Sequence, residues 1–165
     1  MKQNASFDAS FWINSCVAGI VTHVIDYFHL FVTDEVAREI RYPLAVLQMQ
    51  SRTATLFDEW LAQGEIKLQN PKATVSWFQS GENAAIALAI EQDYFLLIDD
   101  ANPYHRAKSV GLRVVGTSDF SVFLYDQGRI AYDGATEALR QMQISKKQRR
   151  VALMTLAELK RLKEG

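Results

Sequence analysis

The chain has 165 residues, of which 48% are hydrophobic, and this predicts one globular domain with a sizeable core. Its one cysteine, Cys16, excludes an internal disulfide and a cysteine-rich zinc site. No apolar run approaches the roughly 20 residues of a membrane helix, and the N-terminus lacks the pattern of a signal peptide. We therefore expect a cytoplasmic protein without membrane contact.

The net charge of −1 is distributed unevenly along the chain. Residues 140–165 contain eight basic and two acidic residues, a surplus of six positive charges that leaves the rest of the chain at −7. This separation suits an acidic site in the body of the protein and a basic face that contacts a polyanion. A solvated helix face or a docking surface for an acidic partner remains an alternative for the basic segment.

Strand and helix patterns alternate in chain order. The first strand is expected at 5–8, followed by a helix at 10–19 and a second turn, or an extension of that helix, at 21–28. The following elements are a strand at 30–32, a helix from 33 or 34 to 40, a break at Pro43 and a long helix at 44–63 capped by Gly64. A strand at 65–68 and a loop at 70–78 complete this half.

The second half begins with a helix at 82–92 that Ser80 can cap. A continuous apolar strand at 94–98 is typical of a parallel sheet buried on both faces. We then expect a helix at 102–110, a strand at 112–115, a helix up to Gly128 capped by Thr117 or Ser118, and two helices at 136–142 and 146–163.

This alternation predicts an α/β protein, a three-layer α/β/α sandwich with a central parallel sheet of four to five strands plus C-terminal helices. We assign residues 1–135 to the main domain and residues 136–165 to a helical extension packed on the same domain.

Acidic side chains stand where strands end or helices begin. Asp8 follows the first strand, the pair Asp99–Asp100 follows the buried strand at 94–98, and Glu82 opens the helix between them. In parallel sheets, sites lie outside the carboxyl ends of the strands. Oxygen ligands of this kind suit a hard divalent ion such as Mg²⁺ or Mn²⁺.

Taken together, these segments resemble the PIN-domain nucleases, in the same order along the chain. The stretch 7–10 resembles the first strand and first acid of that family, and 32–39 resembles the strand and helix that supply the second acid, here Glu39. The stretch 80–89 resembles the family's Gly-Glu helix with Glu82 as third acid. The closing strand, acid, helix and strand are matched by 96–100, 106–107 and 111–117.

The resemblance implies Mg²⁺- or Mn²⁺-dependent hydrolysis of phosphodiester bonds. Asp8 and Asp100 are the preferred direct ligands, and Asp99 is the alternative to Asp100 because adjacent residues leaving a strand point in opposite directions. Glu82 would bind the metal directly or through water. Glu39 would act from an outer position, by orienting a metal-bound water or as general base.

Polar residues near these acids are candidates for contact with nucleic acid. Ser10 and Asn14 lie on the helix after the first acid, and Arg106 and Lys108 could hold a phosphate backbone. Tyr104 and His105 could stack on an unpaired base. Asp119 is either an additional acid or a helix cap.

The branch that this chain most resembles is related to the VapC-type toxins, which implies RNA as substrate and an antitoxin as partner protein. The alternative is a catalytically inactive module that binds nucleic acid or protein, and a DNA nuclease of the same chemistry is equally compatible with the motifs. The helices at 44–63 and 136–163 carry more apolar residues than one small core needs, so we also expect a homodimer.

Overall fold

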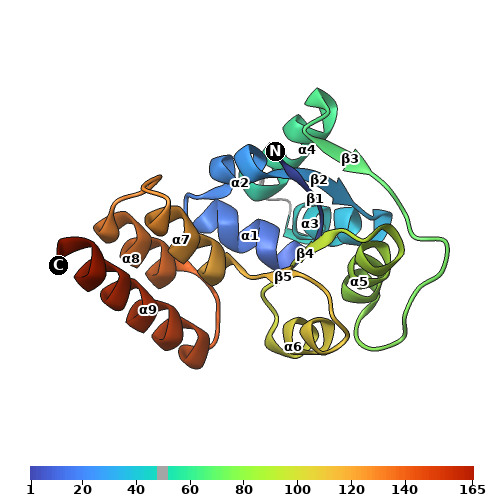
Figure 1. Ribbon diagram of the computed structural model, residues 1–165. Coiled ribbons are helices and arrows are strands. Elements are labelled where there is room, and N and C mark those ends of the chain that lie inside the picture. The colour runs from blue at the N-terminus through green and yellow to red at the C-terminus, as the bar shows by residue number, and fades with distance from the viewer. Residues whose placement is uncertain (48–51) are drawn as a thin grey trace.

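A parallel sheet of five strands forms the centre of the protein (Figure 1). The structure is a computed structural model that describes residues 1–47 and 52–165. The sheet has the order β3-β2-β1-β4-β5, and its strands are β1 (Gln3–Phe7), β2 (Phe28–Val32), β3 (Ile66–Leu68), β4 (Phe95–Leu97) and β5 (Val114–Val115). The predicted α/β fold with a central parallel sheet is confirmed.

The strand order places the switch point of the sheet beside its central strand. β1 pairs with β2 on one side and with β4 on the other, in the register Phe7 with Leu97. The chain first builds the sheet outward through β2 and β3, then crosses to β4 and β5. The ends of β1 and β4 are therefore neighbours, and ligand sites form in the crevice at such a point.

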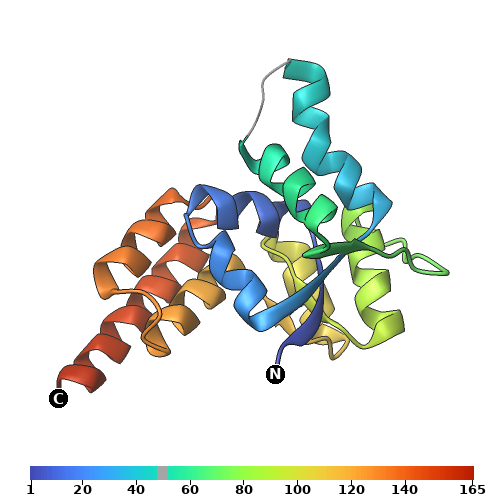
Figure 2. The ribbon, with the colours of Figure 1, turned by 90° about the horizontal axis from the view of Figure 1, so that it is seen from above.

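Helices connect the strands and cover the sheet (Figure 2). α5 packs against β1 and β4, α2 against β2, and α4 against β3, whereas α7, α8 and α9 pack on one another at the end of the molecule far from β3. None of the helices within the described residues is both long and apolar enough to cross a membrane. The helices are α1 (Ala9–Val17), α2 (Val21–Tyr27), α3 (Asp34–Leu47), α4 (Arg52–Gln63), α5 (Ser80–Gln92), α6 (Ala101–Ser109), α7 (Thr117–Asp126), α8 (Tyr132–Gln141) and α9 (Lys146–Glu164).

Aromatic side chains fix α1 and α4 against the sheet. Trp12 of α1 meets Phe57 and Trp60 of α4 edge to face, with ring centroids 5.7 and 5.3 Å apart. The indole nitrogen of Trp12 donates to the carbonyl of Thr53 at 2.8 Å. Each edge-to-face pair contributes about 0.5–1.5 kcal/mol beyond the burial of its area. This packing holds α1, and with it the residue that precedes it, in one position relative to β1.

Two local predictions need correction, one on the break at Pro43 and one on the helix caps. α3 continues through Pro43 to Leu47, so the predicted break at this proline is wrong. Proline removes one amide donor, which here costs the helix a single hydrogen bond and does not end it. The N-caps of α5 and α7 are Gln79 and Gly116, and neither Ser80, Thr117 nor Ser118 holds that position. The predicted continuous helix at 44–63 includes 48–51, which lie outside the described residues.

The C-terminal helices share the core of the sheet domain. Leu139 of α8 and Leu156 of α9 are fully buried in the same hydrophobic cluster as the strands. Arg149 of α9 donates to the carbonyls of Leu139 and Met142, which are free of helix partners at the end of α8. α8 begins at Tyr132, so the predicted boundary between residues 135 and 136 falls inside this helix.

Candidate metal centre

Three carboxylates from distant parts of the chain converge at the carboxyl ends of β1 and β4. Asp8 is the N-cap of α1, Glu82 lies in the first turn of α5, and Asp100 is the N-cap of α6. One oxygen atom from each lies within 4.8 Å of the others. They meet because β1 and β4 are adjacent and α5 packs across both strands.

The hydrogen bonds of Asp8 leave one of its oxygens available to a cation. Asp8 is 2% exposed, and Ser10 donates to its Oδ2 atom from the backbone amide at 3.4 Å and from the hydroxyl at 3.0 Å. Among the described residues, Oδ1 is buried without a hydrogen-bond partner. A buried carboxylate oxygen without a partner is costly. A divalent ion held by Asp8, Glu82 and Asp100 would satisfy it, so the residues present fit a metal.

Burial, together with the neighbouring carboxylates, raises the pKa values of Glu82 and Asp8. The pKa of Glu82 is raised to about 7 by burial, by its hydrogen bond to Asp100 and by the charges of Asp8 and Asp100. Burial also raises the pKa of Asp8, although Ser10 and the amides at the start of α1 oppose this. Carboxylates that resist ionisation together are stabilised by a cation between them.

Glu39 reaches the edge of this centre from α3. Its carboxylate rests on Gly81, so that a Cβ atom added to that glycine would lie 2.1 Å from Oε1. The backbone of Gly81 forms a hydrogen bond with Glu39, while burial and the charge of Asp8 raise the pKa of this carboxyl. Among the described residues, Glu39 is not one of the three converging carboxylates.

The two adjacent aspartates have different surroundings. Asp100 belongs to the converging group, whereas Asp99 is 4% exposed and points toward the start of α7. The amide of Thr117 donates to Asp99 Oδ1 at 2.5 Å, and Asn14 Nδ2 and the Thr117 hydroxyl donate to Oδ2. Burial raises the pKa of Asp99 to about 6 despite these bonds. Of the two sequence alternatives, the structure brings Asp100 into the converging group, whereas Asp99 hydrogen-bonds to Asn14 and Thr117 beside it.

The other predicted site residues divide into internal and exposed ones. Ser10 links Asp8 to the amide of Asp99, from which its hydroxyl accepts at 3.1 Å. Asn14 is buried and binds both the carbonyl and the amide of Gln143. Ser10 and Asn14, two of the four residues predicted to contact nucleic acid, thus form hydrogen bonds within the protein.

Arg106 and Lys108 remain on the surface of α6. The Arg106 guanidinium lies 4.7 Å from the ring centroid of Trp77, and Lys108 lies 5.3 Å from that of Tyr104. Asp119 accepts from the Gly116 amide and the Tyr104 hydroxyl, so of its two predicted roles it fills that of the helix cap.

Sequence reasoning missed three residues that support the centre. Thr117 holds Asp99, Gly81 leaves space for Glu39, and Gln148 of α9 donates to the carbonyl of Asp99 at 3.0 Å. Gln148 also completes the N-terminal cap of α9 with Ser145. The capping pattern was detectable in the sequence, but the contact with Asp99, 49 residues away, was not.

Replacing Thr117 by valine is expected to destabilise the protein. The change conserves volume but removes the hydroxyl donor of buried Asp99, which costs about 1–3 kcal/mol. We expect the melting temperature to fall by roughly 3–10 °C. The control is Thr136→Val on α8, where the hydroxyl only donates to the carbonyl of Tyr132 in its own helix. Equal melting temperatures for the two variants in thermal unfolding would contradict the anchoring role.

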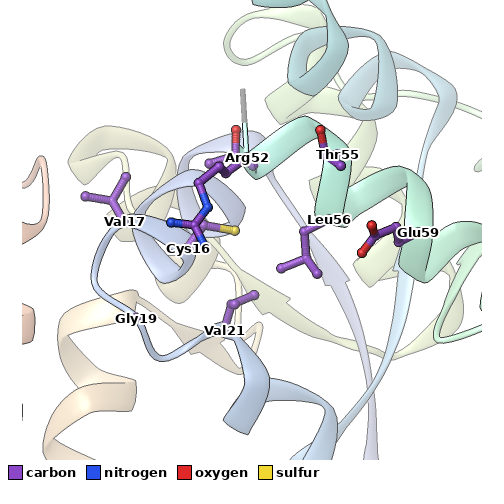
Figure 3. A pocket seen from close by; sticks show the side chains of 9 residues that line it. Cys16, Val17, Gly19, Val21, Arg52, Thr55, Leu56 and Glu59 are labelled. Atoms are coloured by element: carbon purple, nitrogen blue, oxygen red, sulfur yellow. The ribbon is translucent and has the colours of Figure 1, made fainter. Parts of the chain in front are cut away.

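A wide hollow lies away from these carboxylates (Figure 3). It has a volume of about 830 Å³ and lies between the end of α1 and the start of α4, lined by Cys16, Arg52 and Leu56 among others. Burial raises the pKa of the Cys16 thiol to about 12, so it stays protonated at neutral pH. A protonated thiol is a weak nucleophile.

Comparisons with known proteins give a family for this arrangement. A protein-family model described as PIN domain matches residues 20–164. Among solved structures, the chain is similar to a PilT N-terminus domain protein from the hyperthermophilic archaeon Sulfolobus solfataricus P2, at 14% sequence identity and a TM-score of 0.44. That match covers 70% of this chain and 88% of the other. No curated protein matches.

Proposed function

Because the chain belongs to the PIN-domain family, whose members are typically metal-dependent nucleases, we propose that it is a Mg²⁺- or Mn²⁺-dependent endoribonuclease. The observation that carries this proposal is the convergence of Asp8, Glu82 and Asp100, with one buried oxygen of Asp8 left without a partner among the described residues. A site that served only to bind nucleic acid would gain nothing from three crowded carboxylates, because they repel phosphate.

In the proposed reaction Asp8, Glu82 and Asp100 would hold the divalent ion, and the hydrogen bonds of Asp99 would keep the turn that carries Asp100 in place. When bound, the ion would neutralise charge on the scissile phosphate and lower the pKa of a water molecule. Glu39 lies close enough to Asp8 and Asp100 for their charges to raise its pKa. From there it would orient the attacking water or accept its proton. A raised pKa makes the carboxylate a stronger base, which suits the second role.

The direct test is a cleavage assay with the purified chain. We expect single-stranded RNA to be cut in the presence of Mn²⁺ or Mg²⁺ and to remain intact with EDTA. DNA oligonucleotides of the same sequence form the second arm, because the 2′-hydroxyl is the group by which a protein distinguishes the two. Binding of RNA without cleavage across a diverse panel would favour the inactive binding module instead.

Gly81→Ala is expected to lower cleavage by roughly 10–100-fold, the range seen when a residue supporting a metal site is lost. The new methyl group would occupy the position of the Glu39 carboxylate, which must swing away. Because that carboxylate is the end of a flexible side chain, the fold should tolerate the change. Steady-state kinetics with Mn²⁺ should show the loss in kcat, while thermal unfolding stays near that of the unmodified chain.

The matched control for this variant is Gly134→Ala in α8. A Cβ atom there meets nothing within 4 Å, so alanine should preserve activity and add about 0.5–1 kcal/mol of helix stability. Full activity of Gly81→Ala would contradict the assignment of Glu39. If Gly81→Ala does lose activity, Glu39→Gln should show the same fall in kcat, because it removes the charge of the carboxylate itself.

An antitoxin partner and a homodimer remain predictions. The exposed apolar residues Val151, Met154 and Leu162 on α9 support a protein contact on this helix, since each is more than half exposed. A toxin role would be supported if the protein arrested growth on expression and a small protein encoded beside it reversed the arrest.

A further inference from the structure

Apart from Arg149, which donates to the carbonyls of Leu139 and Met142, the basic residues of α9 fall into two groups with different surroundings. Those near its C-terminus have carboxylate partners, whereas at its N-terminal end Lys146, Lys147 and Arg150 have no carboxylate within 4.0 Å among the described residues. The partnered group consists of Lys160 with Glu164, Arg161 with Glu158, and Lys163 with Asp126. Positive charge that is not compensated is therefore concentrated at one end of this helix.

The positions of Lys146 and Lys147 do not stabilise the helix that carries them. Lys146 and Lys147 are the first two residues of α9, and its first turn contains no acidic residue. The N-terminus of a helix carries a partial positive charge, which destabilises cations and stabilises anions. A contact with a negatively charged ligand would explain why lysines stand there.

A groove of about 510 Å³ runs between this end of α9 and α6, with α7 as its floor. Lys147 lines it from α9, and His105 and Lys108 line it from α6. Figure 1 shows α6 and the N-terminal end of α9 on the same lower side of the molecule. Asp119 also borders the groove, but its Oδ2 atom accepts from the Gly116 amide and the Tyr104 hydroxyl.

The groove borders the turn that carries Asp99 and Asp100, although none of the three converging carboxylates lines it. Its lining begins at Ala101, the residue directly after Asp100, and includes Gln148, which donates to the carbonyl of Asp99. A polynucleotide with one phosphate at the three carboxylates could therefore continue into the neighbouring groove, which has a cation on each wall.

We propose that this groove holds the phosphodiester backbone of a single-stranded polynucleotide next to the scissile phosphate, an inference that rests on the proposed nuclease function. Lys108 and Lys147 contact phosphates from the two walls, as compact point charges do. His105 is exposed on the α6 wall and stacks on an unpaired base. A protein ligand is the less favoured occupant, because the cations on the two walls match a regularly charged backbone.

The test measures binding separately from cleavage. The full chain carrying Asp8→Asn is titrated in EDTA with fluorescent single-stranded RNA and DNA of the same sequence, at several salt concentrations. Adding K108A and K147A together should weaken binding roughly tenfold. The slope of log K against log salt should become shallower by about 1.4, since each lost contact to a single strand removes roughly 0.7.

The matched control adds K2A and K67A, which remove the same charge. These lysines line a different hollow, beside β2 and β3. The control should keep its affinity and its salt slope, whereas K108A/K147A should lose affinity and have a shallower slope. This result would support binding in the groove, for RNA or for DNA according to which of them binds. Circular dichroism and the melting temperature must show that both variants are folded, and a K147E variant with unchanged melting temperature provides a second measure of binding.

Equal salt slopes for the two double variants would overturn the groove, as would a parent chain that binds neither oligonucleotide. Tighter binding of duplex than of single strands would overturn the assignment of His105 to an unpaired base. These outcomes are distinct from a failure of the nuclease proposal, in which the unmodified chain cleaves nothing with Mn²⁺ while K108A/K147A still loses its affinity for the strand.

Discussion

Replacing Asp8 by asparagine should abolish metal-dependent cleavage of RNA, with a fall in kcat/KM of about 10³-fold or more. The asparagine would keep the shape of the side chain and the bonds from Ser10, but it would remove the charge from the most deeply buried ligand of the three. The remaining pair, Glu82 and Asp100, would hold a divalent ion weakly because fewer anionic oxygens surround it. Cleavage of a labelled RNA in Mn²⁺ measures the effect.

The control for this variant is Asp93→Asn. Asp93 ends α5 in the left-handed region at a φ of 55°, a conformation that asparagine adopts readily. Its carboxylate is 95% exposed and only pairs with Arg113. We expect full activity for this change. If Asp8→Asn and Asp93→Asn were equally active, the converging carboxylates would not be the catalytic centre.

We expect a rise in pH to lower the free energy of unfolding when the centre is empty, and bound metal to raise it. The pKa of Glu82 is raised from 4.5 to about 7 in the folded protein. Between these values the folded state binds a proton more tightly than the unfolded state does, so without metal the free energy of unfolding falls as the pH rises from 4.5 to 7. Ionised carboxylates are what the metal binds, so Mn²⁺ should bind more tightly over the same range.

Thermal unfolding at pH 5 and pH 8 measures both effects. At pH 8, Mn²⁺ at about 100 times its dissociation constant should add about 2.7 kcal/mol, or roughly 5–10 °C in melting temperature. At pH 5 the shift should be much smaller. Glu82→Gln should melt higher than the unmodified chain at pH 8 without metal and should lose most of the response to Mn²⁺.

The control is Glu91→Gln, at the other end of α5. Glu91 is exposed and its carboxylate accepts from the amide of Lys72. This change should leave both the pH dependence and the Mn²⁺ response intact. A Mn²⁺ shift in melting temperature that does not vary with pH, or that survives Glu82→Gln, would show that the ion binds elsewhere.

The sequence alone determined the elements, the sheet and the acids of the centre. The alternation of strand and helix patterns predicted each of the five strands, because parallel strands need crossover connections, which are usually helices. β4 was recognisable as a continuous apolar run that is buried in the sheet, and β3 by the alternation of Ile66 and Leu68 with Glu65 and Lys67. Asp8 and the pair Asp99–Asp100 were identifiable because they directly follow predicted strands, and Glu82 because it opens a helix. Helix ends were less accessible, as Pro43 shows, because one lost hydrogen bond does not end a helix that other contacts support.

The tertiary structure decided which side chains face one another. Of the neighbours Asp99 and Asp100, only the fold places Asp100 in the converging group, because Asn14 and Thr117 bind Asp99 from positions 85 and 18 residues away. The position of the basic C-terminal helix beside α6, and the contact of Gln148 with Asp99, depend in the same way on long-range packing. Local patterns record only what a residue's near neighbours require, whereas a site is formed by groups that the sequence separates and the fold brings together.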